Sequence, residues 1–443
     1  MQHQFTKRQL SALIIPLVLE SAFSLLIGIA DTMMVGSFGE AAISAVALSD
    51  SFSALVVLVF ASFATGGSVV IGQYLGKKDK GKASLAARNL LYLTLFLTLL
   101  LMAVMVPFHR QILHVIYGDL EASVTAYTSE YLVPVILSYL FLGLYSSLNA
   151  ITRAEGKTSM ILYVSLVMNG LNILGNFLLV VVLHLGPKGA GISTLVSRAV
   201  AFLLMASWLF GHSALDLKRI GKEKPDKESM KTISRLAIPQ GIEGGLFNLA
   251  KLMVASLAAS LGTRAVAIDS VAWNFNAFST IIGEGLALSL VTIAAQCRGA
   301  GNEEDIHYYR TLLLKIFLLM TILVCPPLFF WTKEVIALYG LTPEAIEEAV
   351  PLCRAVLLSG LLLWPFGVLL PSVLKAAGDM KYILVSNVIS MWVFRVLLAT
   401  LLVKVCGFGL WGLWIGTFAS LIYRGIAYEL RYRKGKWKSL RVI

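Results

Sequence analysis

The sequence has 443 residues, of which 58 % are hydrophobic and only 14 % are charged. A water-soluble domain carries about 25 % charged residues because its surface must be solvated, so this composition excludes a soluble enzyme, a disordered chain and a nucleic-acid-binding module. Uncharged apolar runs recur along the chain. Each run is long enough to cross a bilayer, for which a helix needs about 20 apolar residues. The sequence therefore predicts an all-α polytopic membrane protein.

The apolar runs predict twelve transmembrane helices, and a polar connection divides them into two groups of six. The spans are expected at 10–36, 43–74, 88–107, 126–150, 160–184, 190–212, 233–260, 266–297, 310–330, 350–373, 380–404 and 408–430. We expect an N-terminal six-helix lobe at 1–212, a cytoplasmic linker at 213–232, a C-terminal six-helix lobe at 233–430 and a basic cytoplasmic tail at 431–443.

The charge distribution predicts the orientation of the chain. The formal net charge is +12, and Lys and Arg concentrate on the termini and the even-numbered connections. By the positive-inside rule, both termini lie in the cytoplasm and the protein spans the inner (plasma) membrane. The basic surplus is thus a topology signal and does not indicate nucleic acid. The four cysteines are scattered without a C-x-x-C pair, so we expect neither a disulfide nor a metal site.

The two halves repeat one another. A displacement of 223 residues aligns Ile15-Pro16 with Ile238-Pro239 and Glu20 with Glu243. Because each half has an even number of spans, the repeats are parallel, as two six-helix bundles related by a pseudo-two-fold axis along the membrane normal. Two such bundles enclose a central cleft, which is the architecture of a transporter. Pro16 and Pro239 are expected to bend the first and seventh helices symmetrically, because proline frees a backbone carbonyl.

Motifs in both halves carry a family resemblance. They are Ala-Asp-Thr-Met-Met-Val-Gly-Ser-Phe-Gly (30–39), Gly-Gln-Tyr-Leu-Gly (72–76), Arg-Ala-Glu-Gly-Lys (153–157), Ile-Pro-x-x-x-Glu (238–243) and Lys-Ala-Ala-Gly-Asp (375–379). The ordered set resembles the multidrug and toxic compound extrusion (MATE) family. The resemblance implies a twelve-helix antiporter that exports small organic compounds, including cationic aromatic ones, in exchange for H⁺ or Na⁺.

Polar residues within the N-terminal spans are candidates for ion coupling, because ionisable groups in a membrane are costly. Asp31 is an acid late in the first span, and Asn172 and Asn176 are spaced i, i+4 on one helical face. The resemblance implies that these residues and Thr194 form a cation site like that of the DinF-like branch. The second acid of that branch is replaced here by Asn176. The alternative is that the asparagines only join helices by hydrogen bonds.

The C-terminal spans hold a second set of polar residues. The resemblance to NorM-like relatives implies a functional acid at Glu243, whereas the acidic partner that those relatives carry in the tenth span is missing. Lys251 and Arg395 either pair with acids, reach an interface, or line the cleft and select an anionic or zwitterionic substrate. The candidate cavity and substrate residues of this half are Glu243, Lys251, Asp269, Asn276 and Glu284.

Other functions find little support in the sequence. Gly156-Lys157-Thr158 ends like a phosphate-binding loop, but the glycine needed at position 151 is Ile. We therefore expect no nucleotide, no cofactor and no metal beyond a Na⁺ ion at Asp31. The rivals are a flippase for lipid-linked or amphipathic substrates and, with less support, a membrane-embedded enzyme. The sequence predicts a monomeric secondary active exporter in the lipid bilayer that works by alternating access.

Overall fold

The protein is helical throughout the part that the structure describes. The computed structural model describes the backbone of residues 3–35, 40–118 and 121–443, and their side chains except those of residues 24–35, 40, 41, 43 and 122. No strand occurs in these residues. Within them, nine helices are long and apolar enough to span a membrane, and a tenth span forms if 343–362 and 365–376, bent by 44°, are taken together.

The chain divides into two compact units. The N-terminal unit is Phe5–Ile238, and the C-terminal unit is Pro239–Val442 with His3 and Gln4. The division falls inside helix α7, beside Pro239, and not in the 213–232 connection. The helices that begin in the N-terminal unit are α1 (Lys7–Val35), α2 (Glu40–Gly76), α3 (Lys80–Tyr117), α4 (Ala122–Ala154), α5 (Thr158–Asn176), the π-helix η2 (Phe177–Val182), α6 (Gly186–His212) and α7 (Lys227–Ala259).

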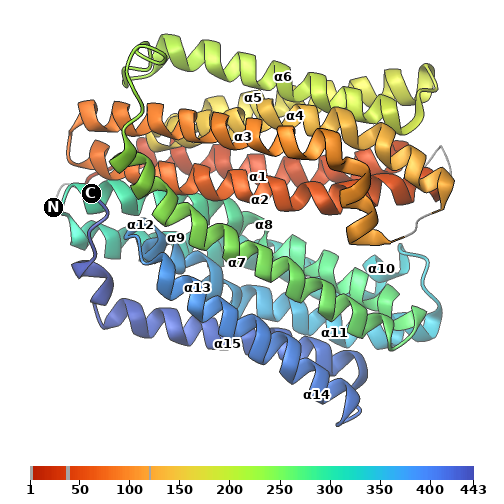
Figure 1. The fold of residues 1–443 in the computed structure, drawn as a ribbon. Coiled ribbons are helices and arrows are strands. Elements are labelled where there is room, and N and C mark those ends of the chain that lie inside the picture. The colour runs from red at the N-terminus through yellow and green to blue at the C-terminus, as the bar shows by residue number, and fades with distance from the viewer. Residues whose placement is uncertain (1–2, 36–39, 119–120) are drawn as a thin grey trace. The chain divides into compact units, whose positions relative to one another are not determined.

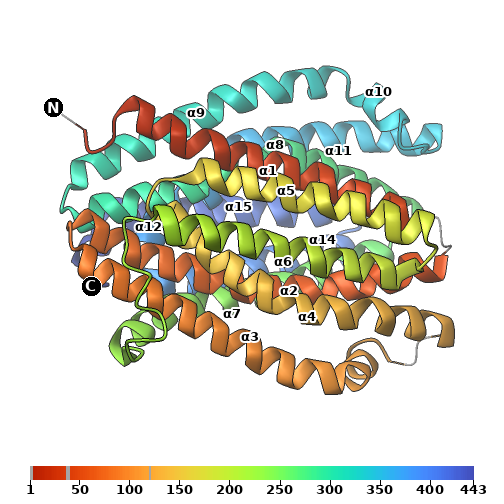
Figure 2. The ribbon, with the colours of Figure 1, turned by 90° about the horizontal axis from the view of Figure 1, so that it is seen from above.

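The N-terminal unit is built around α4, which packs on α2, α3 and α6. Figure 1 shows α5 beside α6, and Figure 2 shows α1 running along α5. The core of this unit is an apolar cluster that includes Phe60, Leu132 and Tyr139, all at most 1 % exposed. Because α1 packs on α5 and α5 packs on α6, these three helices are neighbours in the N-terminal unit.

Pro16 shapes the contact between α1 and α5. A proline at this position cannot donate to the carbonyl of Ala12, four residues earlier. The hydroxyl of Thr158, the first residue of α5, donates to that carbonyl at 2.7 Å and to the carbonyl of Leu13 at 3.0 Å. The backbone group that Pro16 frees is thus satisfied by the next helix. The symmetric bending of both proline helices stays a prediction.

The connection between the predicted lobes is held on α3. Arg88 donates to the carbonyl of Asp216 at 2.8 Å and pairs with Glu223 at 2.5 Å. Tyr92 accepts a hydrogen bond from the Gly221 amide at 2.7 Å. The polar segment that the sequence assigns to a linker is therefore fixed against the N-terminal unit.

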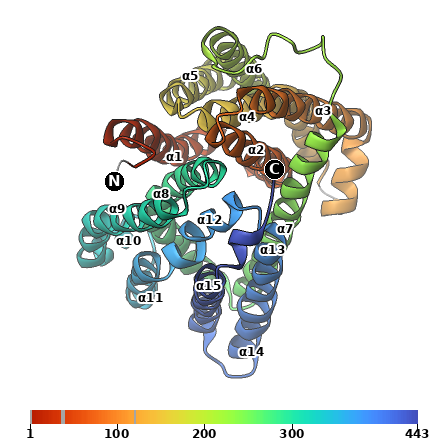
Figure 3. The ribbon, with the colours of Figure 1, turned by 90° about the vertical axis from the view of Figure 1, so that its left-hand side faces the viewer.

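The C-terminal unit contains the remaining helices, seen end-on in Figure 3, where α8 lies next to α9. They are α8 (Thr263–Gly299), α9 (Glu303–Phe330), α10 (Thr332–Ala337), α11 (Pro343–Leu362), the π-helix η3 (Pro365–Leu369), α12 (Pro371–Ala376), α13 (Met380–Ile389), the π-helix η4 (Ser390–Leu398), α14 (Ala399–Lys404), α15 (Gly409–Arg433) and the 3₁₀-helix η5 (Lys436–Ser439). Across the two units, each of the twelve predicted spans overlaps one helix or a run of consecutive helical segments.

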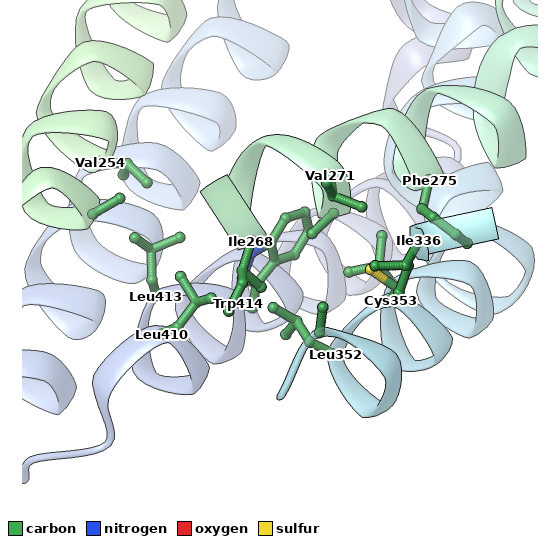
Figure 4. Close-up of a cluster of buried hydrophobic side chains, with 14 of the residues drawn as sticks. Val254, Ile268, Val271, Phe275, Ile336, Leu352, Cys353, Leu410, Leu413 and Trp414 are labelled. Carbon is green, nitrogen blue, oxygen red and sulfur yellow. The ribbon is translucent and has the colours of Figure 1, made fainter. Parts of the chain in front are cut away.

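The core of the C-terminal unit surrounds Trp414. Figure 4 shows its indole among Ile268 of α8 and Leu410 and Leu413 of α15, with Val254 of α7 nearby. Trp414 is 1 % exposed and is among the largest fully buried side chains. The cluster joins α7, α8 and α15 into one apolar body. It supplies the rigid support for the polar side chains described next.

Candidate functional site

The N-terminal unit brings two of the predicted coupling residues, Asn172 and Thr194, into contact. Asn172 and Asn176 are buried on α5. The side-chain amide of Asn172 donates to the hydroxyl of Thr194 on α6 at 3.3 Å, and Ser193 donates to the Asn172 carbonyl at 2.8 Å. These side chains place amide and hydroxyl oxygens, which are hard ligands, between two apolar helices.

A glycine permits this close approach of α5 and α6. A Cβ atom built on Gly175 would lie 2.4 Å from the Ser193 hydroxyl oxygen and 3.1 Å from its Cβ. Only a residue without a side chain fits at that distance. Gly175 therefore sets the spacing at which Asn172 reaches Thr194.

Asp31 lies on α1, the helix that packs along α5, and its side chain is outside the described residues. The assignment of Asp31 to the coupling site accordingly stays a prediction. Glu20, eleven residues earlier on α1, is half-buried and lies within the electrostatic influence of Arg153 at the end of α4. The N-terminal unit thus has a basic residue that partly offsets the burial of one of its membrane acids.

Glu243 of α7 belongs to a hydrogen-bonded network in the C-terminal unit. The side-chain amide of Asn387 on α13 donates to Glu243, and Tyr428 of α15 donates to Asn387 at 2.8 Å. Arg424 of α15 is 8 % exposed and acts electrostatically on the same group of residues. The acidic partner expected of NorM-like relatives is thus replaced by an amide, a phenol and an arginine.

A pocket of about 200 Å³ opens between α7, α8 and η4 in the C-terminal unit. Lys251, Asp269 and Arg395 supply its charges, and the indole of Trp273 forms one wall. The remaining lining residues are small and mostly apolar. The sequence leaves open whether Lys251 and Arg395 line a cavity; both line this pocket.

Asp269 is fixed by the core behind the pocket. Its carboxylate, 8 % exposed, accepts a hydrogen bond from the Trp414 indole nitrogen at 2.9 Å. Trp414 in turn is held in the apolar cluster of Figure 4. The acid is therefore oriented by a rigid donor and lies in the electrostatic field of both Arg395 and Lys251.

Two residues of the predicted C-terminal set lie outside this pocket. Asn276 is half-buried, and its backbone carbonyl accepts the hydroxyls of Ser279 and Thr280. Glu284 is exposed, and Lys375 is the basic residue that influences it. In the described part of the chain, no three His, Cys, Asp or Glu side chains gather as a metal centre would require.

Several residues of these sites escape sequence reasoning. Asn387 donates to Glu243, Tyr428 donates to Asn387, and Arg424 acts electrostatically on Glu243, all from helices that are remote in sequence. Of these three residues, only Arg424 could be singled out from the sequence, because an arginine in an apolar span needs a partner. Arg395 lies on the π-helix η4, whose wider turn shifts side chains off the ordinary helical period.

Comparisons with known proteins agree on one family. The family profile MatE matches residues 16–178 and 239–401, two segments that start 223 residues apart, which is the displacement of the internal repeat. The chain is 25 % identical over 444 residues to the probable multidrug resistance protein NorM of Thermotoga maritima, covering 99 % of this chain and 94 % of that protein. It is 27 % identical over 437 residues to the uncharacterized transporter YisQ of Bacillus subtilis, covering 95 % and 93 %. A crystal structure of MATE in the bent conformation superposes with a TM-score of 0.90 at 22 % identity, covering 98 % of this chain and 96 % of that chain.

Proposed function

Because this chain belongs to the MatE family of multi-pass membrane transporters, we propose that it exports small organic compounds across the cell membrane in exchange for H⁺ or Na⁺. It is a transporter and not an enzyme. The name of the Thermotoga relative, a probable multidrug resistance protein, supports the export of several compounds. We further propose that the protein works as a monomer by alternating access, with both termini in the cytoplasm.

The observation that carries the proposal is the polar group between α5 and α6. Asn172, Asn176 and Thr194 lie among apolar helices beside α1, the helix of Asp31. One carboxylate with amide and hydroxyl oxygens can hold Na⁺, and the same carboxylate can instead carry a proton. We also propose that this cation site resembles that of the DinF-like branch. Replacement of the second acid by Asn176 favours a site that a single acid, Asp31, controls.

Ion binding at Asp31 would bias the equilibrium between inward-open and outward-open states. An ion shifts such an equilibrium only by its difference in affinity for the two states. Neutralising Asp31 would remove that difference for either ion. Glu243, with its network on α13 and α15, is the proposed counterpart that contacts the substrate in the C-terminal unit.

The test is transport by the full-length protein in proteoliposomes under an imposed Na⁺ or pH gradient. The probes are ethidium, an aromatic cation, and fluorescein, an aromatic anion. We expect efflux of at least one probe with at least one gradient, and we expect Asp31→Asn to reduce it to the level of empty liposomes. Glu344→Gln, at the exposed start of α11, is the matched control for losing one acid. Undiminished efflux in the Asp31 variant would refute the assignment, and transport that needs no gradient would favour a flippase.

A further inference from the structure

The charges of the C-terminal pocket do not balance. Lys251 and Arg395 contribute two positive charges and Asp269 one negative charge. Within the described residues, neither Lys251 nor Arg395 forms an ion pair, although eleven ion pairs occur there. The pocket therefore presents a net positive charge to whatever enters it.

Arg395 is the least satisfied of these groups. It is only 4 % exposed, and its Nε atom has no hydrogen-bond partner among the described residues. Its Nη1 atom reaches only the sulfur of Met391, at 3.7 Å. Because buried arginine is costly without an acceptor, this geometry leaves donors available for an incoming anionic group.

The walls of the pocket suit a ring attached to that anionic group. The Trp273 indole lies 5.1 Å from the Arg395 guanidinium carbon and 5.6 Å from the Lys251 Nζ atom, each measured to the ring centroid. Val254 and Ala258 belong both to the lining and to the apolar cluster around Trp414. A planar apolar body can therefore rest on α7 while its charged end faces Arg395.

We propose that this pocket binds the carboxylate of a small aromatic substrate. Resting on the proposed export function, the inference names its substrate class: aromatic anions, and zwitterions that carry a carboxylate. The planar guanidinium of Arg395 donates to the carboxylate, Lys251 adds a second positive charge, and the ring packs on Val254, Ala258 and Trp273. Asp269, held by Trp414, opposes the anion and keeps its affinity low enough for release.

Substitutions of Asp269 and of the basic residues distinguish carboxylate binding from a general loss of folding. Removing a positive charge and removing the negative charge must change carboxylate affinity in opposite directions, whereas two variants that merely loosen the fold would both weaken binding. Asp269→Asn also retains an oxygen that can accept from Trp414, so the core contact is preserved.

The experiment measures equilibrium binding of radiolabelled benzoate to the full-length protein in detergent, without any gradient. We expect saturable binding to the wild type. Arg395→Gln should weaken it about tenfold or more, as loss of a charge-assisted hydrogen bond does, and Arg395→Lys should weaken it less. Asp269→Asn should tighten binding several-fold. Benzylammonium, which has a similar shape and the opposite charge, should bind the wild type more weakly than benzoate.

Lys315→Gln is the matched control, because it removes one positive charge from α9 outside the pocket. If Arg395→Gln does not fold, Lys251→Gln replaces it with the same expected direction. The proposal is overturned if the wild type binds no benzoate, if the pocket variants all shift affinity in one direction, or if Lys315→Gln weakens binding as much as they do. Gradient-driven efflux without benzoate binding would refute this inference alone, and benzoate binding without gradient-driven efflux would refute the proposed function alone.

Discussion

The candidate sites of the two units differ in their charge. The described groups of the N-terminal site, Asn172 and Thr194 among them, are neutral amides and hydroxyls. The C-terminal site is built from ionisable side chains, with Glu243, Asp269 and Arg395 lying among apolar helices. Neutral polar groups are cheaper to bury than charges, so the two units must be stabilised differently. Two copies of one repeat have thus acquired different chemistry.

This difference is consistent with a division of labour. A site of neutral oxygens needs only one carboxylate to hold a small cation. A site of fixed charges in a low-dielectric interior discriminates strongly between substrate groups of opposite sign. The comparison therefore supports the proposal that the N-terminal unit couples the ion and the C-terminal unit selects the substrate.

The largest expected effect on stability is that of Glu243→Gln. It removes a carboxylate that accepts from Asn387 and acts electrostatically on the buried Arg424, and weakening the compensation of a buried charge costs up to about 3 kcal/mol in the free energy of unfolding. We also expect substrate affinity to fall more than ion coupling. Chemical denaturation in detergent and the two proteoliposome assays measure these effects. Glu344→Gln, at the exposed start of α11, is the control. Wild-type stability together with wild-type affinity would remove Glu243 from the site.

A smaller effect is expected from Gly175→Ala in the N-terminal unit. The new Cβ atom would overlap the Ser193 hydroxyl, so Ser193 must turn away from the Asn172 carbonyl or α5 and α6 must move apart slightly, at a cost of about 2 kcal/mol. Gly170→Ala is a control on the same helix, because nothing lies within 4 Å of its Cβ position. Alanine there should be neutral or stabilise by up to about 1 kcal/mol through helix propensity. Equal stabilities of the two variants would contradict the close approach of α5 and α6.

Asn176→Asp tests whether the N-terminal site lacks an acid. Adding a carboxylate beside Asn172 should lower the Na⁺ concentration for half-maximal efflux about tenfold, equivalent to about 1.4 kcal/mol. Asn169→Asp is the matched control, because Asn169 donates to Ser165 of its own helix at 3.3 Å, whereas Asn172 donates to Thr194 of α6. A similar gain in both variants would indicate a general electrostatic effect and not a cation site.

The sequence predicts some of these features well and others poorly. The helical spans follow from the length of apolar runs, and the facing of Asn172 and Asn176 follows from their i, i+4 spacing. The network around Glu243 does not follow, because Asn387 meets Glu243, and Tyr428 meets Asn387, only through tertiary packing. Arg395 is an intermediate case, because the sequence names it among the residues that can line the cleft but does not show that it lies on a π-helix.

The C-terminal set illustrates the same limit. Sequence spacing groups Asp269 with Asn276 on one face of α8, yet only Asp269 lines the pocket. The contacts of each residue differ. Trp414 of α15 donates to the Asp269 carboxylate, whereas the backbone carbonyl of Asn276 accepts from Ser279 of its own helix. The spacing of residues in the sequence shows which of them share a helical face. It does not show which other helix packs against that face.

The smallest effect concerns the two prolines, which are equivalent in sequence and differ in environment. Thr158 donates to the Ala12 carbonyl that Pro16 frees. In this part of the repeat the displacement is 222 residues, which aligns Arg153 with Lys375 and Thr158 with Met380 at the start of α13, and methionine has no hydroxyl. Thr158→Val should therefore destabilise the protein by about 1 kcal/mol, the contribution of one hydrogen bond, and Thr158→Ser should retain wild-type stability. Denaturation of the three proteins measures the difference. Equal stability of the Val and Ser variants would mean that the carbonyl needs no partner, and the asymmetry between Thr158 and Met380 would then have no energetic consequence.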